Sequence, residues 1–203
     1  MEKLLNNIKQ QLQNNTSRPF LIAIDGMCGS GKSTAIEYLS AKGVPKIYFG
    51  GVILKAIADA GLEDTPETEQ RFRTELREKE GKDFVVRRVV ADAKNLIAAG
   101  QKRIVLDGLY SWTEYKILRA EFPTELTVVA VVAPKALRRK RVAKRPERPL
   151  TAQEVAERDK NEIEQLEKGG PIAIADYYLD NSGTIEQLHA GLDAILQEIG
   201  FFA

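Results

Sequence analysis

The turn between residues 26 and 33 constrains the fold of this chain more than any other segment. Its sequence, GMCGSGKS, fits the pattern G-x-x-x-x-G-K-[ST]; it follows the apolar run PFLIAID and precedes the helical pattern TAIEYL. Glycines in such a turn let the backbone fold around phosphate oxygens, and the helix that follows presents its positive N-terminal end. The order strand, turn and helix distinguishes the motif from a chance Gly-rich turn and predicts a loop that binds the phosphates of a nucleoside triphosphate.

The rest of the chain alternates short apolar runs with helical patterns. Strands are expected at five runs, which are residues 19–25, 45–49, 102–109, 126–133 and 177–181. The first, third and fourth are almost continuously apolar, as strands buried on both faces are. Helix starts are marked by Thr65-Pro66-Glu67 and by capping boxes at Ser111, Thr151 and Thr184. This alternation predicts an α/β fold with a mostly parallel sheet covered by helices on both faces.

Composition and charge limit the classes of protein to which this chain can belong. The 203 residues suit one α/β domain, and the hydrophobic content of 43% is spread too patchily for a membrane span. The 30 Lys and Arg residues balance 29 Asp and Glu residues, which excludes a general attraction to nucleic acid. The single Cys excludes an intramolecular disulfide, and residues 1–15 have the pattern of an amphipathic helix rather than of a signal peptide. We therefore expect a cytoplasmic protein without nucleic-acid or membrane partners, of undetermined oligomeric state.

The glycine turn predicts residues for a nucleotide and its metal ion. Nucleotide contacts are expected from the turn and the start of its helix, which are Gly26, Met27, Cys28, Gly29, Ser30, Gly31, Lys32, Ser33 and Thr34. Lys32 is expected to reach the β- and γ-phosphates, and the Ser33 hydroxyl to bind Mg²⁺ together with Asp107, which acts through water. Cys28 is interpreted as a spacer whose side chain points away from the phosphates. Asp25 is either a general base, a water-mediated partner of Mg²⁺, or only a cap of the turn.

The residues after the third strand distinguish between classes of nucleotide-binding protein. In many ATP-hydrolysing motors this strand ends in Asp-Glu, whose Glu polarises water, whereas here Asp107 is followed by Gly108. No N-K-x-D guanine motif follows a later strand, which argues against a GTPase. The sequence therefore favours an ATP-dependent small-molecule kinase, whose acceptor brings its own nucleophilic oxygen.

Five segments, taken in order, resemble the nucleotide kinase group of P-loop proteins, which includes adenylate, cytidylate and dephospho-CoA kinases. They are IDGMCGSGKST, YFGGVI, VLDG, VVAPKALRRKRVAKR and the closing stretch from ERDKNEIEQL to DYYLDNSGTIEQL. The resemblance implies a P-loop NTPase fold of three α/β/α layers around a five-stranded parallel sheet, with ATP as the donor. It also implies a single domain with a core at 18–51, 101–133 and 171–203, a helical acceptor-binding insertion at about 52–100 and an Arg-rich lid at about 138–160.

The lid arginines of that group can be matched one by one to arginines of this chain. Its pattern R-x-x-x-R matches Arg141 and Arg145. The resemblance implies that Arg141 packs on the donor adenine and that Arg145 reaches a phosphate group. Arg148 and Arg158 stand at the spacing of two further arginines that contact the transferring phosphoryl group, where fixed cations offset the charge of its oxygens. The alternative is that the basic run is a solvated surface. The expected catalytic residues are Lys32, Asp25, Arg145, Arg148 and Arg158.

The residues expected at the acceptor site differ from those of the nucleotide kinase group. Leu54 and Ser111 stand where related enzymes carry arginines that hold a nucleoside monophosphate, so such acceptors are expected to be poor. Five arginines of the insertion could replace them, which are Arg71, Arg73, Arg77, Arg87 and Arg88. At least three of the five are expected to be ordinary surface charges. Trp112 either lines the acceptor pocket or packs against its neighbours.

Two hypotheses of different classes follow. The preferred one is an ATP-dependent phosphotransferase that uses Mg²⁺ and acts on a nucleotide-like or other small-molecule acceptor. The alternative is a nucleotide-binding regulatory P-loop protein with weak ATPase activity that has lost the acceptor site. The departures at Leu54 and Ser111 motivate the alternative, and the retained lid arginines argue against it.

Overall fold

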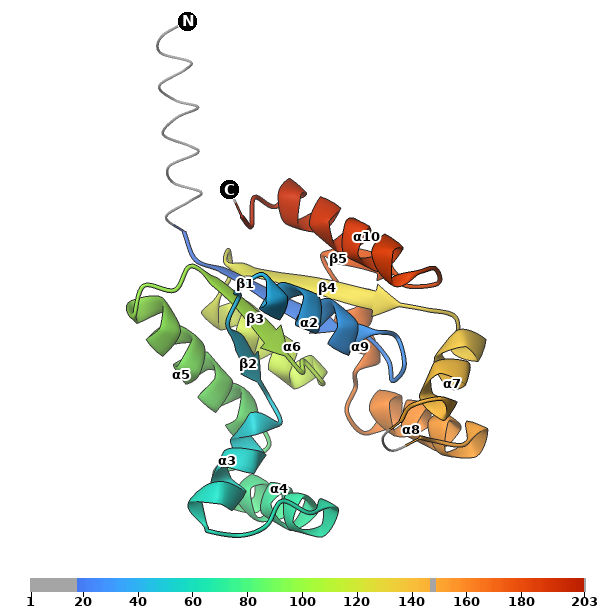
Figure 1. Ribbon diagram of the computed structural model, residues 1–203. Helices are drawn as coiled ribbons and strands as arrows, with labels where there is room; N and C mark the ends of the chain where they lie inside the picture. The colour runs from blue at the N-terminus through green and yellow to red at the C-terminus, as the bar shows by residue number, and fades with distance from the viewer. Residues whose placement is uncertain (1–17, 147–148, 203) are drawn as a thin grey trace, which may run out of the picture.

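A computed structural model describes residues 18–146 and 149–202, and these form one parallel sheet covered by helices (Figure 1). The helix expected over residues 1–15 and the side chain of Arg148 lie outside the described residues.

Five strands form the sheet, as predicted, and each begins and ends within two residues of its expected bounds. They are β1 (Phe20–Asp25), β2 (Lys46–Tyr48), β3 (Arg103–Asp107), β4 (Leu126–Val132) and β5 (Tyr177–Asp180). Their order across the sheet is β2-β3-β1-β4-β5, and every pairing is parallel. Because parallel strands end at the same edge, the carboxyl ends of β1 and β3 bring Asp25 and Asp107 to one side of the sheet.

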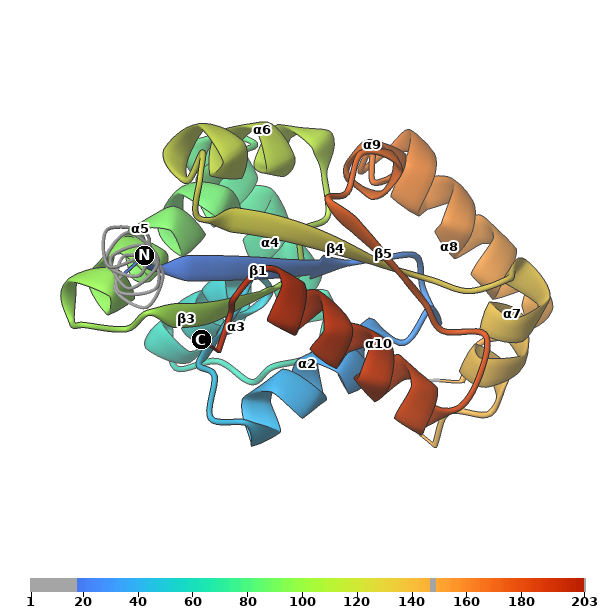
Figure 2. The same ribbon diagram turned by 90° about the horizontal axis from the view of Figure 1, so that it is seen from above.

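Helices cover both faces of the sheet. They are α2 (Lys32–Ala41), α3 (Gly51–Asp59), α4 (Pro66–Glu80), α5 (Phe84–Ala98), α6 (Trp112–Glu121), α7 (Lys135–Ala143), α8 (Ala152–Glu164), α9 (Gly169–Ala173) and α10 (Ile185–Glu198). Helices α2 and α10 pack on one face and α5 and α6 on the other, so the three-layer α/β/α prediction is confirmed (Figure 2). Within the described ranges, no helix combines the length and the apolar composition needed to cross a membrane.

The central strand β1 shows why its sequence is continuously apolar. Leu21 and Ala23 point into the cluster under α5 and α6, whereas Ile22 and Ile24 point into the cluster under α2 and α10. All four side chains have an exposed fraction of 0%. Since successive side chains of a strand point to opposite faces, a strand between two helical layers needs apolar residues at every position.

Helix α4 has far fewer contacts with the core than α5. Among its residues whose side chains are described, none is buried, and only Phe72 and Leu76 pack partly against the core. Its N-terminus is capped by Thr65, whose Oγ1 accepts a hydrogen bond of 3.2 Å from the N–H of Thr68. A helix with so little buried surface depends on its cap and on local ion pairs more than on packing.

We predict that Thr65→Ala loosens α4 while leaving the global fold intact. Loss of an N-cap costs about 1 kcal/mol, which corresponds to roughly fivefold faster amide hydrogen exchange in the helix. The exchange rates of residues 68–80 measure this effect. The matched control is Thr74→Ala in the middle of the same helix, where Thr74 Oγ1 bonds only the Gln70 carbonyl (3.0 Å). Equal exchange in the two variants would contradict the role of the cap.

Candidate functional site

The glycine turn joins the end of β1 to the start of α2 and is held by partners on both sides. Gly29 and Gly31 have φ values of 79° and 104°, in the left-handed region that favours glycine. A Cβ at Gly29 would lie 2.7 Å from the carbonyl oxygen of Arg138, so the loop leaves no room for a side chain there. Asn181 Nδ2 donates to the Ser30 carbonyl at 2.7 Å and fixes the far side of the turn.

Lys32 folds back over the turn. Its Nζ donates to the carbonyls of Gly26 at 2.5 Å and Met27 at 3.2 Å. Burial, together with the neighbouring Lys168 ammonium group, lowers the pKa of Lys32 to about 8. The ammonium group therefore bonds the backbone of the turn itself, and the expected contact of Lys32 with the β- and γ-phosphates stays a prediction.

Cys28, at the tip of the turn, is enclosed by α7 and α8. Its side chain is buried against Val142 and Val155, so it points away from the inside of the loop. Its N–H donates to Glu162 Oε2 at 3.1 Å, and its carbonyl accepts from Arg138 Nη1 at 2.8 Å. Helices far along the chain therefore bond both backbone polar groups of this one residue.

An ion pair that the sequence analysis did not identify connects α7 and α8. Arg138 donates to the two carboxylate oxygens of Asp159 at 2.8 and 2.9 Å, and both side chains are buried. The basic run around residue 138 thus contains a structural arginine as well as surface charges. No local pattern links the pair, because 21 residues separate its members.

Two acidic side chains lie at the carboxyl edge of the sheet. Asp25 is fully buried, and its Oδ1 accepts from the Gly26 N–H at 2.6 Å. Burial raises the pKa of Asp25 to about 6, and the Lys168 ammonium group limits the rise. Asp107 is more open, with Lys46 Nζ at 3.6 Å, and burial raises its pKa as well.

The oxygen donors near the turn fit Mg²⁺. Ser33 is exposed at the start of α2, and the Asp107 side chain is 21% exposed at the end of β3. Among the described residues, no group of three or more His, Cys, Asp or Glu side chains could hold a metal ion. A hydroxyl and one carboxylate suit Mg²⁺, which usually takes its other ligands from water and substrate phosphates.

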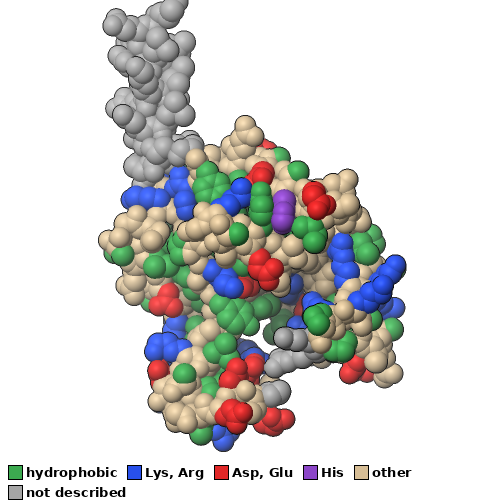
Figure 3. All heavy atoms as spheres, viewed as in Figure 1, with side chains coloured by type: hydrophobic (Ala, Val, Ile, Leu, Met, Phe, Trp, Pro, Cys, Tyr) green, Lys and Arg blue, Asp and Glu red, His purple; other side chains and the backbone are tan. Residues whose placement is uncertain are grey.

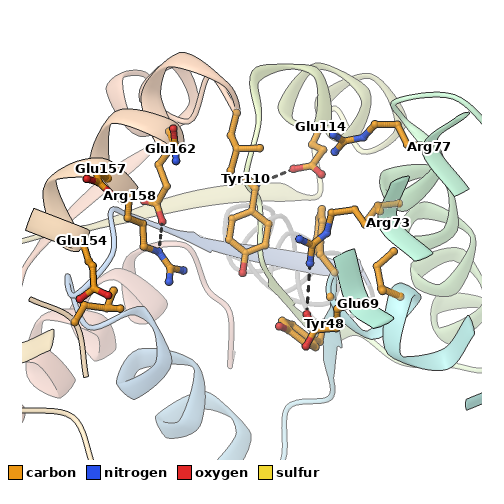
Figure 4. Close-up of a pocket in the computed structure, with 17 residues that line it drawn as sticks. Tyr48, Glu69, Arg73, Arg77, Tyr110, Glu114, Glu154, Glu157, Arg158 and Glu162 are labelled. Carbon is orange, nitrogen blue, oxygen red and sulfur yellow. Dashed lines mark hydrogen bonds and ion pairs between the residues drawn. The ribbon is translucent and has the colours of Figure 1, made fainter. Parts of the chain in front are cut away.

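The expected lid arginines lie in different surroundings. Arg141 Nη2 is 3.4 Å from Asn181 Oδ1, beside the glycine turn. Arg145 is exposed beyond the end of α7. Arg158 is on α8, where its Nε lies 3.3 Å from Glu162 Oε1 and the side chain borders a cleft (Figure 4).

This cleft has a volume of about 670 Å³ and lies between the α3–α5 segment and α8 (Figure 3). Its lining contains more acidic than basic side chains. The acidic ones are Glu69, Glu114, Glu154, Glu157 and Glu162, and the basic ones are Arg73, Arg77 and Arg158. Tyr110 projects between the two walls (Figure 4). Since Glu162 also bonds the tip of the glycine turn, the cleft borders the turn directly.

Only two of the five candidate arginines of the predicted insertion line this cleft. Arg73 and Arg77 are one helical turn apart on α4, and Arg73 lies 3.6 Å from Glu69. The other three form ion pairs elsewhere, in the pairs Arg71–Glu75, Arg87–Asp83 and Arg88–Glu80. Leu54, Ser111 and Trp112 are not among the lining residues, and Trp112 stacks on Tyr115 instead.

Glu114 and Tyr110 form a polar pair in the wall of the cleft. Glu114 Oε2 accepts from the Tyr110 N–H at 2.7 Å, rather than completing the capping box expected with Ser111. Burial raises the pKa of Glu114 to about 7, although the N–H groups of Tyr110 and Ser111 oppose the rise. Burial also raises the pKa of the Tyr110 hydroxyl, which therefore stays protonated at neutral pH.

We predict that Glu114→Gln changes the pH dependence of stability. A carboxyl whose pKa rises from 4.5 in the unfolded chain to about 7 in the fold binds its proton more tightly when folded. The wild type should therefore lose stability relative to the variant as pH rises through this window, by about 3 kcal/mol in total. Denaturant unfolding between pH 4 and 8 measures the difference. Glu78→Gln, at an exposed position, serves as control. If the difference in unfolding free energy between the wild type and Glu114→Gln stays constant with pH, the prediction is wrong.

Comparison with known proteins agrees with this architecture. Residues 22–168 match the family model described as an AAA domain. A UPF0200 protein of Thermococcus kodakarensis is 32% identical over 182 residues, which cover 88% of this chain and 97% of the relative. A UPF0200 protein of Pyrococcus abyssi is 30% identical, with 90% of this chain and 98% of the relative covered.

Solved structures of kinases share the fold. A shikimate kinase from Aquifex aeolicus has a TM-score of 0.54 at 18% identity, covering 91% of this chain and 100% of that one. A gluconokinase from Sinorhizobium meliloti has a TM-score of 0.53 at 15% identity, covering 91% and 98%. A dephospho-CoA kinase from Campylobacter jejuni has a TM-score of 0.52 at 16% identity, covering 88% and 96%. The chain therefore belongs to the UPF0200 family and carries an AAA domain with the fold of P-loop nucleotide kinases.

Proposed function

We propose that this protein transfers the γ-phosphoryl group of ATP to a hydroxyl of a small polar molecule bound in the cleft between α4 and α8. The observation that carries the proposal is the position of Glu162, which lines the cleft and also bonds the Cys28 N–H of the glycine turn. A molecule in the cleft would thus lie next to a nucleotide held by the turn. This adjacency is what phosphoryl transfer requires, because its catalysis consists mostly of positioning and charge stabilisation.

The donor is held by the turn and by arginines of the proposed lid at about 138–160. The N–H groups at the start of α2 and the Lys32 ammonium group bind the β- and γ-phosphates. Arg141 packs on the adenine, and Arg145, Arg148 and Arg158 offset the charge of the transferring group. Ser33 and Asp107 would hold Mg²⁺, which neutralises charge on the phosphate oxygens when bound.

The transfer step needs a nucleophile, a leaving group and a destination for one proton. The acceptor hydroxyl oxygen forms a bond to the γ-phosphorus, while the bond from that phosphorus to the β,γ-bridging oxygen breaks and ADP leaves. Because Asp25 is fully buried and does not line the cleft, the hydroxyl proton reaches its carboxylate through one water. A pKa of about 6 suits a base that works near neutral pH.

The cleft favours an acceptor with little negative charge. Five of its charged lining residues are Glu and three are Arg, so a phosphate monoester would meet a net acidic surface. Leu54 and Ser111 do not line the cleft, so the charged residues of the cleft itself decide which acceptor it favours. We expect a polyhydroxy compound with at most one anionic group, which Arg77 would bind.

An acceptor screen with Lys32→Met tests the proposal. We expect ADP release from Mg·ATP that depends on a polyhydroxy acceptor and falls at least about 100-fold in the variant. Nucleosides, dephospho-CoA, hydroxy acids and the monophosphates AMP, CMP, UMP and GMP form the panel, and the monophosphates should be poor acceptors. The control is Lys55→Met, whose side chain is 77% exposed. ADP release that no acceptor stimulates would instead support the regulatory protein with weak ATPase activity.

We predict that Arg77→Gln weakens acceptor binding specifically. Loss of one charge-assisted contact should raise the KM for the acceptor about 10–100-fold and leave the KM for ATP within threefold. Arg71→Gln is the matched control, because Arg71 is on the same helix but does not line the cleft. Steady-state kinetics with the acceptor found in the screen separate the two constants. A rise in the KM for ATP alone would place Arg77 on the donor side and refute its assignment.

A further inference from the structure

Lys168 is a buried cation to which neither the sequence nor the proposed function assigns a role. It follows α8, and its exposed fraction is 0%. Its Nζ lies 3.7 Å from Asp25 Oδ1 and 3.7 Å from Glu162 Oε2. Among the described residues, no hydrogen-bond partner of this Nζ is found, and Asp25 Oδ2 is also without one. A buried ammonium group is costly unless charged partners surround it, so these two carboxylates explain how the fold tolerates it.

The same two carboxylates hold the glycine turn. Asp25 Oδ1 accepts from the Gly26 N–H at 2.6 Å, at the start of the turn. Glu162 Oε2 accepts from the Cys28 N–H at 3.1 Å, at its tip. Without a cation between them, two buried carboxylates would repel each other and at least one would take up a proton. Lys168 is therefore placed to keep both carboxylates charged and in position beneath the turn.

Lys168 also contacts a side chain that lines the acceptor cleft. Its Nζ lies 4.7 Å from the centre of the Tyr110 ring, within the range of a cation–π interaction. Tyr110 lines the cleft and projects between its walls (Figure 4). One ammonium group thus touches the supports of the phosphate-binding turn and an aromatic side chain of the acceptor site.

We propose that Lys168 is a positioning residue for phosphoryl transfer, which holds the Asp25 and Glu162 carboxylates under the turn and the Tyr110 ring in the cleft. The proposal rests on the proposed function for its catalytic consequence. Its structural consequence, the fixing of two N–H groups of the turn, can be measured without any acceptor.

Lys168→Met tests the proposal, with Lys160→Met as the matched control on an exposed site of α8. Amide hydrogen exchange, followed by NMR, should become at least about tenfold faster at Gly26 and Cys28 relative to Ile22 in the core of β1. With the acceptor from the screen, kcat should fall at least about 30-fold, while the KM for Mg·ATP changes less than threefold. A folded variant whose exchange ratio stays within twofold of the wild type, or whose kcat stays within threefold, would overturn the proposal.

A second variant covers the case in which Lys168→Met does not fold. Glu162→Gln combined with Lys168→Met removes one charge of each sign, so the net charge of the cluster is unchanged, and the amide oxygen introduced at 162 can still accept from Cys28. Exchange at Gly26 should still accelerate and kcat should still fall. If neither variant folds while Lys160→Met does, Lys168 is required for folding rather than positioning, and the proposal is wrong. If the wild type transfers phosphoryl to no acceptor, the proposed function fails, and the exchange ratios alone decide whether Lys168 positions the turn.

Discussion

The rest of the site depends on the hydrogen bonds that α7 and α8 make to the backbone N–H and carbonyl of Cys28. A phosphate-binding turn must keep glycines in a left-handed conformation and direct its N–H groups inward, and the glycines themselves have no side chains to enforce this. Here the constraint comes from outside, since Glu162 and Arg138 bond the N–H and the carbonyl of one residue at the tip. Any movement of α7 or α8 therefore acts directly on the turn.

This arrangement requires several charges to be buried together. Arg138 and Asp159 form a two-point ion pair, and Lys168 lies between Asp25 and Glu162. Replacing a buried ion pair by apolar residues of similar volume often stabilises a protein, so such groups are weak evidence for stability. Their value here is geometric, because they connect the turn to α7 and α8 through single hydrogen-bonding groups. A core of apolar side chains could not fix individual N–H and carbonyl groups in this way.

The sequence predicted the features that local pattern determines. The strands, the glycine turn and the cap at Thr65 each depend on a few neighbouring residues, and all lie where expected. The contact between Glu162 and the turn could not be predicted, since 134 residues separate Cys28 from Glu162 and no period connects them. The arginines of α4 were ambiguous for another reason. A helix without a buried apolar face gives no signal of which side meets the protein, so Arg73 and Arg77 were identified only by their place in the cleft.

The two halves of the site therefore differ in how freely they can change. The donor half is built from backbone groups and from buried charges that depend on one another, so a substitution at Glu162 or Lys168 disturbs several contacts at once. The acceptor wall on α4 consists of exposed side chains on a helix with little core packing, where most substitutions cost little stability. Under the proposed function, the residues that bind the acceptor can therefore change while the glycine turn stays the same.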